Sequence, residues 1–126
     1  MAEAREGSAI EIWGDGKQTR SFLYIDECLE GTTRLTRSDF TGPVNIGSEE
    51  MVSIDQLADM VMKIAGKKLT KKHVAGPQGV RGRNSDNHLI YGKLKWKPTQ
   101  PLDIGMGLTY TWIETQVKTM SHHHPE

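Results

Sequence analysis

The stretch SIDQLADMVMKIAGKK, residues 53–68, constrains the fold more strongly than any other part of the chain. Ser53 is a favoured N-cap residue, and Gln56 three positions later completes a capping box. Gly66 is a typical helix stop. Apolar residues recur at helical spacing on one face: Ile54, Leu57, Val61 and Ile64. The pattern predicts an amphipathic helix that must pack this face against another element.

Short runs with strand composition lie on both sides of this helix. AIEIW, residues 9–13, alternates apolar and polar residues, and the Asp15-Gly16 turn separates it from a second run, RSFLYI, residues 20–25. VNI, residues 44–46, is a short apolar run bounded by glycine and proline and predicts a buried strand. LTKKHVAG, residues 69–76, predicts a fourth strand.

Three further helices are expected. The first covers Asp26 to Arg37 with Asp26 as its N-cap, although Gly31 weakens this prediction. Residues 88–96 form a short helix, and residues 102–118 form the last one. Its apolar face consists of Leu108, Trp112 and Ile113. The order β-β-α-β-α-β-α-α predicts a mixed α/β (α+β) fold.

Composition sets the broad class. The 126 residues are enough for one domain, and 16 Lys and Arg residues balance 16 Asp and Glu residues. A neutral chain has no overall field for a polyanion, which argues against nucleic acid as the main partner. Cys28 is the single cysteine, so an internal disulfide is excluded. No long apolar run or signal peptide is present, which favours a soluble cytoplasmic protein without membrane partners.

The two ends are expected to be disordered. We assign residues 1–8 and 119–126 to the ends and residues 9–118 to the folded domain. The three histidines His122, His123 and His124 favour a tail or a purification-tag remnant over a metal site.

Two patterns match dinucleotide enzymes by letter and fail in context. Gly76, Gly79 and Gly82 form G-x-x-G-x-x-G, but a pyrophosphate fingerprint needs a strand before it and a helix directly after it. Here a proline follows the first glycine, and the polar run RNSDN follows the last. Tyr91 and Lys95 have Y-x-x-x-K spacing, but proline and tryptophan end that helix at once. Neither pattern predicts a catalytic centre.

The polar loop GVRGRNSDN, residues 79–87, is the better candidate site. Arg81 and Arg83 are two positions apart and point the same way in an extended segment. Asn84, Ser85 and the backbone N–H groups add neutral donors, and planar guanidinium groups bind phosphate in bidentate fashion. The alternative is a solvated loop whose arginines pair with nearby acids.

Arg20 offers a partner for this loop. It follows Gln18 and Thr19 in GKQTRSF, so an amide, a hydroxyl and a guanidinium stand in a row. Two such segments could clamp a diphosphate from two sides. The alternative is that Arg20 forms a structural ion pair with Asp15 or Asp26.

Three segments, taken together, resemble a known family. IEIWGDGKQTRSFLYIDE, VNIGSEEMVSIDQLADMV and VRGRNSDNHLIYGKLKWKPTQPLDIGMGLTYTWI are similar, in this order and spacing, to segments of extended short-chain dehydrogenase/reductases that act on nucleotide sugars. GVRGRNSDN resembles the members that act on GDP-linked sugars. The resemblance covers Ala9 to Val117, nearly the whole chain.

This resemblance implies the C-terminal, substrate-binding lobe of such an enzyme. The N-terminal Rossmann lobe, which holds NAD and the catalytic Tyr and Lys in the family, has no counterpart here, so we expect no NAD in this chain. Arg20 and Arg83 match the two family arginines that grip the substrate diphosphate, and Arg81 adds charge. Asp86 matches an acid that is structural or orients an arginine. Lys95 replaces the usual glycine before a tryptophan.

The expected function is therefore the binding of a nucleotide sugar, GDP-mannose or GDP-galactose, as part of an NAD-dependent epimerase. Alone, the chain is expected to be inactive. Residues 44–46 and 26–37 would expose an apolar face for the Rossmann lobe or a second copy. The alternative is a free-standing, non-catalytic binding or protein-interaction module. A third reading, a separate enzyme using Tyr91 and Lys95, requires NAD binding.

Overall fold

The computed structural model describes residues 8–77 and 79–121. Its elements are β1 (Ala9–Trp13), β2 (Thr19–Ser21), α1 (Ile25–Thr36), β3 (Met51–Ser53), α2 (Ile54–Ala65), β4 (Thr70–Val74), β5 (Gly82–Arg83), α3 (His88–Leu94) and α4 (Leu102–Ser121). The expectations for residues 1–7 and for the histidine run lie outside the described residues. The mixed α/β class predicted from the sequence is confirmed.

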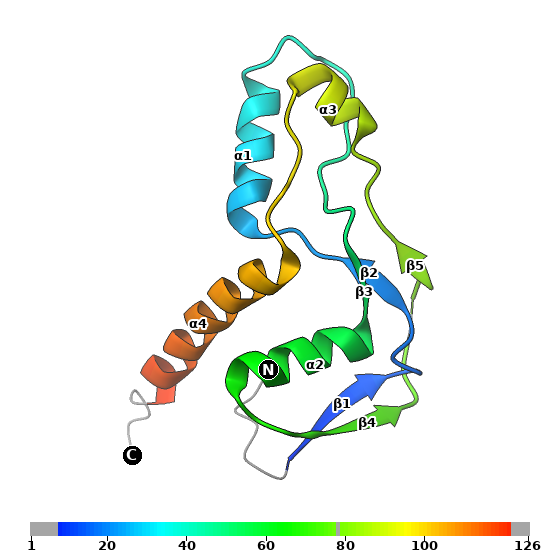
Figure 1. Cartoon of the computed structure of the whole chain (residues 1–126), viewed down its shortest axis with the longest axis vertical. Helices are drawn as coiled ribbons and strands as arrows, with labels where there is room; N and C mark the ends of the chain where they lie inside the picture. The colour runs from blue at the N-terminus through cyan, green and yellow to red at the C-terminus, as the bar shows by residue number, and fades with distance from the viewer. Residues whose placement is uncertain (1–7, 78, 122–126) are drawn as a thin grey trace.

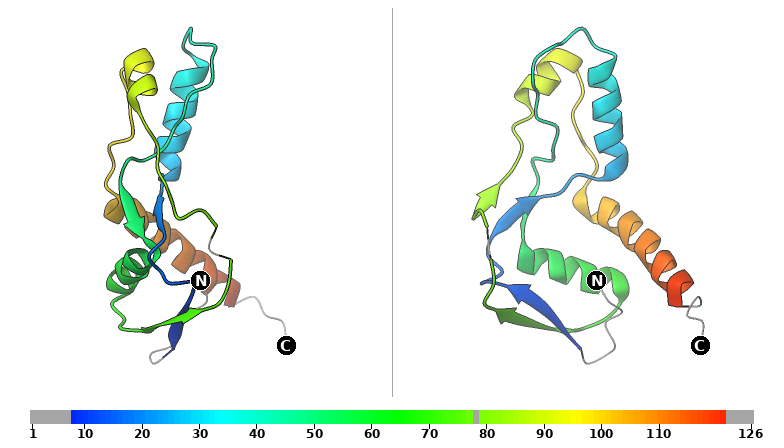
Figure 2. Two further views of the ribbon diagram at one scale, coloured as in Figure 1. Left: turned by 90° about the vertical axis from the view of Figure 1, so that its right-hand side faces the viewer. Right: turned by 180° about the vertical axis from the view of Figure 1, so that it is seen from behind.

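The molecule is elongated. Helices α1 and α3 lie at one end, and α2 lies with β1 and β4 at the other (Figure 1). Strands β2, β3 and β5 lie between the two ends, and α4 runs outward from the middle of the molecule (Figure 2). The site described below therefore lies where the two ends are joined.

Two small sheets organise the chain. Strands β1 and β4 pair in parallel from Ala9–Thr70 to Trp13–Val74. The second sheet has the order β3-β2-β5, in which β2 is antiparallel to β3 and parallel to β5. Strand β2 is therefore paired on both edges, and its position determines which residues of β5 lie beside it.

Helix α2 begins and ends where the sequence predicts. The Gln56 backbone N–H donates to Ser53 Oγ at 3.1 Å, and the Ser53 N–H donates to Gln56 Oε1 at 2.8 Å. Gly66 ends the helix in the left-handed conformation, with φ of 67°. Val61 on the predicted apolar face is buried, together with Ile12 of β1.

Two predicted strands differ from the structure. The strand predicted at residues 20–25 is β2, which ends at Ser21, and α1 begins at Ile25 after an N-cap at Tyr24 rather than Asp26. Residues 44–46 are irregular, and the chain pairs instead through β3 at Met51–Ser53. The two edges of β2 are occupied by β3 and β5, and residues 44–46 instead form part of the pocket lining described below.

Gly31 has a packing role that the sequence does not reveal. It is buried in the middle of α1, and a Cβ atom at this position would lie 2.7 Å from the Trp96 ring. Lys95, the residue before Trp96, has φ of 53°, a left-handed conformation that costs a non-glycine residue about 1–2 kcal/mol. Although lysine stands here in place of the family's usual glycine, the turn keeps its left-handed conformation. The next residue, Trp96, packs on α1 at Gly31.

Replacing Gly31 by alanine should destabilise the protein by about 1–3 kcal/mol, because the added methyl overpacks the contact with Trp96. Gly107→Ala in α4 is the matched control, since no atom lies within 4 Å of a Cβ there. The control should stabilise by about 0.5–1 kcal/mol through helix propensity. Urea unfolding of both variants measures the two effects, and the same sign for both would contradict the packing role.

Two glutamates hold the start of helix α4. Glu27 Oε1 accepts from the backbone N–H groups of Thr99 and Gln100, and Glu50 Oε2 accepts from Leu102 N at 2.9 Å. Leu102 is buried, but Leu108 and Trp112 of the predicted apolar face are 48% and 65% exposed.

The described helix also continues to Ser121, beyond the predicted end at residue 118 and into the predicted tail. The periodic pattern thus predicted the helix correctly, but of the three residues of its predicted apolar face only Ile113 is half-buried. In the described part of the chain, no helix is long and apolar enough to span a membrane.

Candidate functional site

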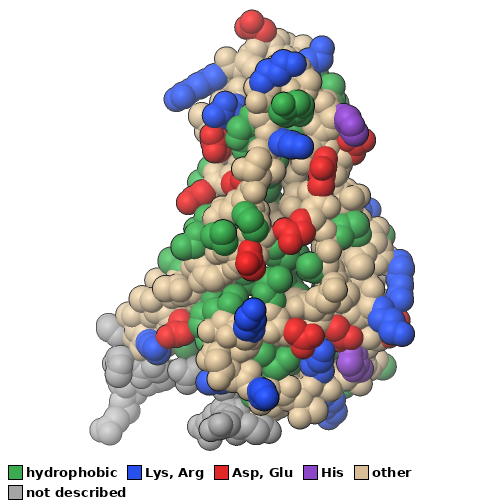
Figure 3. Space-filling model, in the orientation of Figure 1, with side chains coloured by type: hydrophobic (Ala, Val, Ile, Leu, Met, Phe, Trp, Pro, Cys, Tyr) green, Lys and Arg blue, Asp and Glu red, His purple; other side chains and the backbone are tan. Residues whose placement is uncertain are grey.

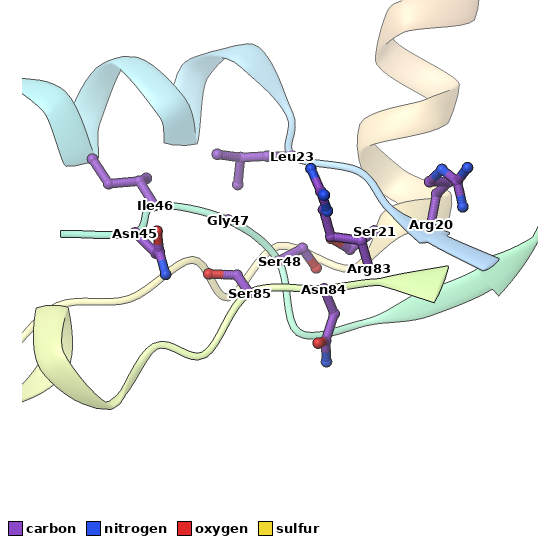
Figure 4. Close-up of a pocket in the computed structure, with 10 residues that line it drawn as sticks. All are labelled: Arg20, Ser21, Leu23, Asn45, Ile46, Gly47, Ser48, Arg83, Asn84 and Ser85. Carbon is purple, nitrogen blue, oxygen red and sulfur yellow. The ribbon is translucent and has the colours of Figure 1, made fainter. Parts of the chain in front are cut away.

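A pocket of about 530 Å³ lies beside β2 and β5 (Figure 4), strands that lie near the middle of the molecule (Figure 1). Its lining comes from three chain segments that are distant in sequence: Arg20, Ser21, Leu23, Asn45, Ile46, Gly47, Ser48, Arg83, Asn84 and Ser85. The structure therefore brings together four of the residues predicted to bind substrate, Arg20, Arg83, Asn84 and Ser85.

The two arginines lie side by side across the sheet. Arg20 of β2 and Arg83 of β5 are register partners in a parallel pairing, so both side chains leave the same face of the sheet. Neighbouring strands are only about 4.8 Å apart, and like charges on directly opposed positions are destabilising. Figure 4 shows both guanidinium groups on the same side of the strands. Such a pair is suited to an anion that neutralises both charges.

Their surroundings differ. Arg20 is half-buried, and its Nη1 donates to the carbonyl oxygen of Thr19 at 2.7 Å. Arg83 is exposed and, within the described residues, forms no ion pair with an acid. One guanidinium is thus held in place by its own strand, while the other is accessible to a ligand from solvent.

The wall opposite the arginines is held by Asn87. This side chain is 2% exposed, and its Nδ2 donates to the Gly47 carbonyl at 2.9 Å, while Ser85 Oγ lies 2.8 Å from its Oδ1. The two segments approach closely, since a Cβ atom on Gly47 would lie 2.7 Å from Ser85 Cβ. Sequence reasoning missed Asn87, whose only local signal is its position before a helix.

Arg81 lies elsewhere. Its Nη1 donates to both carboxylate oxygens of Asp15, at 3.0 and 2.9 Å, and it does not line the pocket. The backbone N–H of Lys17, followed by Arg81, lowers the pKa of Asp15. The alternative considered from the sequence, an arginine paired with a nearby acid, thus describes Arg81 in the structure.

The two supporting residues also have structural partners. Gln18 is 6% exposed, and its Nε2 donates to the Trp13 carbonyl at 3.0 Å, so it holds the turn before β2. Asp86 Oδ1 accepts from the His88 backbone N–H at 3.0 Å and lies 2.6 Å from His88 Nδ1. Asp86 therefore contacts the start of α3 and a histidine, and neither residue lines the pocket.

The Asp86–His88 pair predicts a pH effect. The side-chain hydrogen bond to Asp86 raises the pKa of His88, and the His88 backbone N–H lowers the pKa of Asp86. The stabilisation from charged His88 is present below about pH 6.5 and is lost as pH rises through its raised pKa. Asp86→Asn should therefore lower the pKa of His88 in an NMR titration, whereas the remote Asp103→Asn should not. The same His88 pKa in the wild type, in Asp86→Asn and in Asp103→Asn would contradict the pairing.

The dinucleotide-like patterns do not form a cofactor site. Gly82 lies in β5, and α3 begins only at His88, so the glycines do not face a helix N-terminus as an NAD pyrophosphate requires. Lys95 leaves α3 in a left-handed conformation and so does not share a helix face with Tyr91. Among the described residues, no group of three or more His, Cys, Asp or Glu side chains is placed to hold a metal ion.

Comparison with known proteins adds independent information. No protein-family model matches the chain. The chain is 58% identical over 109 residues to GDP-mannose 3,5-epimerase of Arabidopsis thaliana, covering 86% of this chain and 29% of that protein. It is 35% identical over 114 residues to dTDP-4-dehydro-6-deoxy-D-allose reductase of Streptomyces bikiniensis, covering 90% of this chain and 35% of that protein.

One solved structure is similar to this chain in both fold and sequence. UDP-glucuronic acid 4-epimerase of Bacillus cereus, in complex with UDP-glucuronic acid and NAD, matches with a TM-score of 0.77 and 33% identity, covering 84% of this chain and 35% of that one. The chain thus spans between 29% and 35% of the length of these three proteins.

Proposed function

Because this chain belongs to the extended short-chain dehydrogenase/reductase family of nucleotide-sugar enzymes, we propose that it is the substrate-binding lobe of an NAD-dependent nucleotide-sugar epimerase. The pocket beside β2 and β5 holds the diphosphate of the substrate. The observation that carries this proposal is the register pairing of Arg20 with Arg83 on one face of the sheet.

The chemistry of the pocket suits a diphosphate. Its two linked phosphate groups carry adjacent negative charges, and two neighbouring guanidinium groups can each bind one of them in bidentate fashion. Binding would place negative charge beside both arginines and form new hydrogen bonds with them. The volume of about 530 Å³ falls in the range typical of small-ligand sites. Asn84 adds a neutral polar group to the lining.

The identity to GDP-mannose 3,5-epimerase favours a GDP-linked sugar, GDP-mannose or GDP-galactose, as the substrate. In this proposal the domain is residues 9–118, and NAD and the catalytic groups come from the part of the relatives that the chain does not match. The chain alone is inactive. Arg81, Gln18 and Asp86 support the surrounding loops rather than touch the ligand.

Arg83→Ala should weaken GDP-mannose binding by about 1.5–3 kcal/mol, the usual value for a hydrogen bond to a charged group. Arg37→Ala removes the same charge at the end of α1, away from the pocket, and should leave the affinity unchanged. Amide shifts in an NMR titration should move at Arg20 and at residues 83–85. The proposal fails if none of these signals moves at millimolar GDP-mannose.

An exposed apolar face favours the hypothesis that this chain packs against a partner lobe over the hypothesis that it is a free-standing module. We define the α1–α4 face by five side chains that are each about half exposed or more: Ile25 57%, Leu29 56%, Ile104 52%, Leu108 48% and Trp112 65%. In each helix these residues recur every four positions and so share one side. Figure 3 shows hydrophobic side chains gathered where α1 meets α4.

An exposed apolar face of this kind marks an interaction surface. We propose that the Rossmann lobe covers it, since the matched relatives are about three times longer than this chain.

If the Rossmann lobe is the natural partner of this face, the chain on its own should be a monomer at micromolar concentration and should bind a hydrophobic dye through the exposed face. Trp112→Ser should reduce the dye fluorescence, because it removes the most exposed of the five side chains of the face. Val80→Ser, an exposed loop residue outside the face, should not. Sedimentation measures the oligomeric state in parallel. A dimer that binds no dye would indicate a second copy on this face, and a monomer that binds no dye would favour the free-standing module.

A further inference from the structure

The orientation of the Asn87 amide follows from its neighbours. The Gly47 carbonyl oxygen can only accept a hydrogen bond, so the amide nitrogen of Asn87 must face it, at 2.9 Å. The amide oxygen then faces Ser85 Oγ, at 2.8 Å. Because that oxygen can only accept, the Ser85 hydroxyl must donate its single proton to Asn87.

Asn87 does not use its side chain for the helix it precedes. An asparagine at an N-cap commonly accepts from the first backbone N–H groups of its helix. Here the Asn87 side chain makes no such bond, and Asp86 accepts from His88 N instead. The Asn87 backbone N–H donates to Glu49 Oε1 at 3.1 Å. With 2% of its surface exposed, Asn87 is committed to joining the two pocket walls.

This arrangement determines what Ser85 can offer to a ligand. Ser85 lines the pocket, its proton is engaged by Asn87, and only the lone pairs of Oγ remain available. A phosphate oxygen also presents lone pairs and would be repelled there. A ligand hydroxyl, which has a proton to donate, is the complementary group. The sequence-based view of Ser85 as a phosphate donor therefore does not follow from its geometry.

We propose that the pocket is divided by chemistry, and this inference rests on the proposed function. The end at Arg20 and Arg83 takes the diphosphate, and the end at Ser85 accepts a hydrogen bond from a hydroxyl group of the same ligand. Figure 4 shows Ser85 and Asn45 at the opposite end of the pocket from Arg20. Asn87 is the positioning residue that keeps Ser85 an acceptor.

The test compares three ligands by calorimetry on the full chain: inorganic pyrophosphate, GDP and GDP-mannose. Ser85→Ala should lower the affinity for a hydroxyl-bearing ligand by about three- to tenfold, the loss of one neutral hydrogen bond. Its affinity for pyrophosphate should stay within about twofold of the wild type. The control is Ser38→Ala, because the Ser38 hydroxyl donates to the Leu35 carbonyl oxygen far from the pocket. This variant should bind all three ligands with the wild-type affinity.

The ligands also identify the hydroxyl. A loss with both GDP and GDP-mannose assigns it to the ribose, and a loss with GDP-mannose alone assigns it to the sugar. Asn87→Ala leaves the Ser85 lone pairs but frees its hydroxyl to rotate, so Ser85→Ala should cost less affinity in this background than in the wild type. If Asn87→Ala does not fold, the single Ser85 variant still decides.

Two results would overturn the division of the pocket: an equal loss with pyrophosphate, which makes Ser85 a phosphate donor, or no loss with any ligand. A wild-type chain that binds neither pyrophosphate nor GDP-mannose at millimolar concentration would instead reject the proposed function, and this inference with it.

Discussion

The pairing of β2 on both of its edges holds the rest of the structure in place. Its three residues, Thr19–Ser21, bond β3 on one side and β5 on the other. Strand β3 continues directly into α2, and β5 leads to α3 through the polar loop, so one short strand fixes the starts of two helices. The same register places Arg20 beside Arg83. The pocket and the connection between the two ends of the molecule therefore depend on the backbone hydrogen bonds of this sheet.

Features whose causes are local could be predicted from the sequence. The cap at Ser53 and the stop at Gly66 act within α2 itself, and both are where the pattern placed them. The polar character of the two arginine segments was equally visible. Their register was not, because β5 has only two residues and exists through its pairing with β2. The residue pattern thus indicated the components of the candidate site, and only the family resemblance indicated Arg83 rather than Arg81 as the partner of Arg20.

Features created by contact between distant segments have no local signature. Gly31 looks like a weak point in a helix until the Trp96 ring is seen against it. Residues 44–46 have the composition of a strand, but other strands occupy both edges of β2. Asn87 resembles an ordinary helix cap, yet its amide reaches 40 residues back along the chain to Gly47. In each case the local preference was real, and tertiary packing used the residue for something else.

The adjacent acids Glu49 and Glu50 have a consequence for how this chain can evolve. Glu49 accepts from the N–H of Asn87 just before α3, and Glu50 accepts from Leu102 at the start of α4. Neighbouring residues of an extended segment point to opposite sides, which lets one short loop reach two helices. Loops generally tolerate insertions and deletions. Here a change in length by one residue would turn the two glutamate side chains to the opposite sides, and the hydrogen bonds to Asn87 and Leu102 at the starts of α3 and α4 would be lost. This loop should therefore keep its length even where its sequence changes.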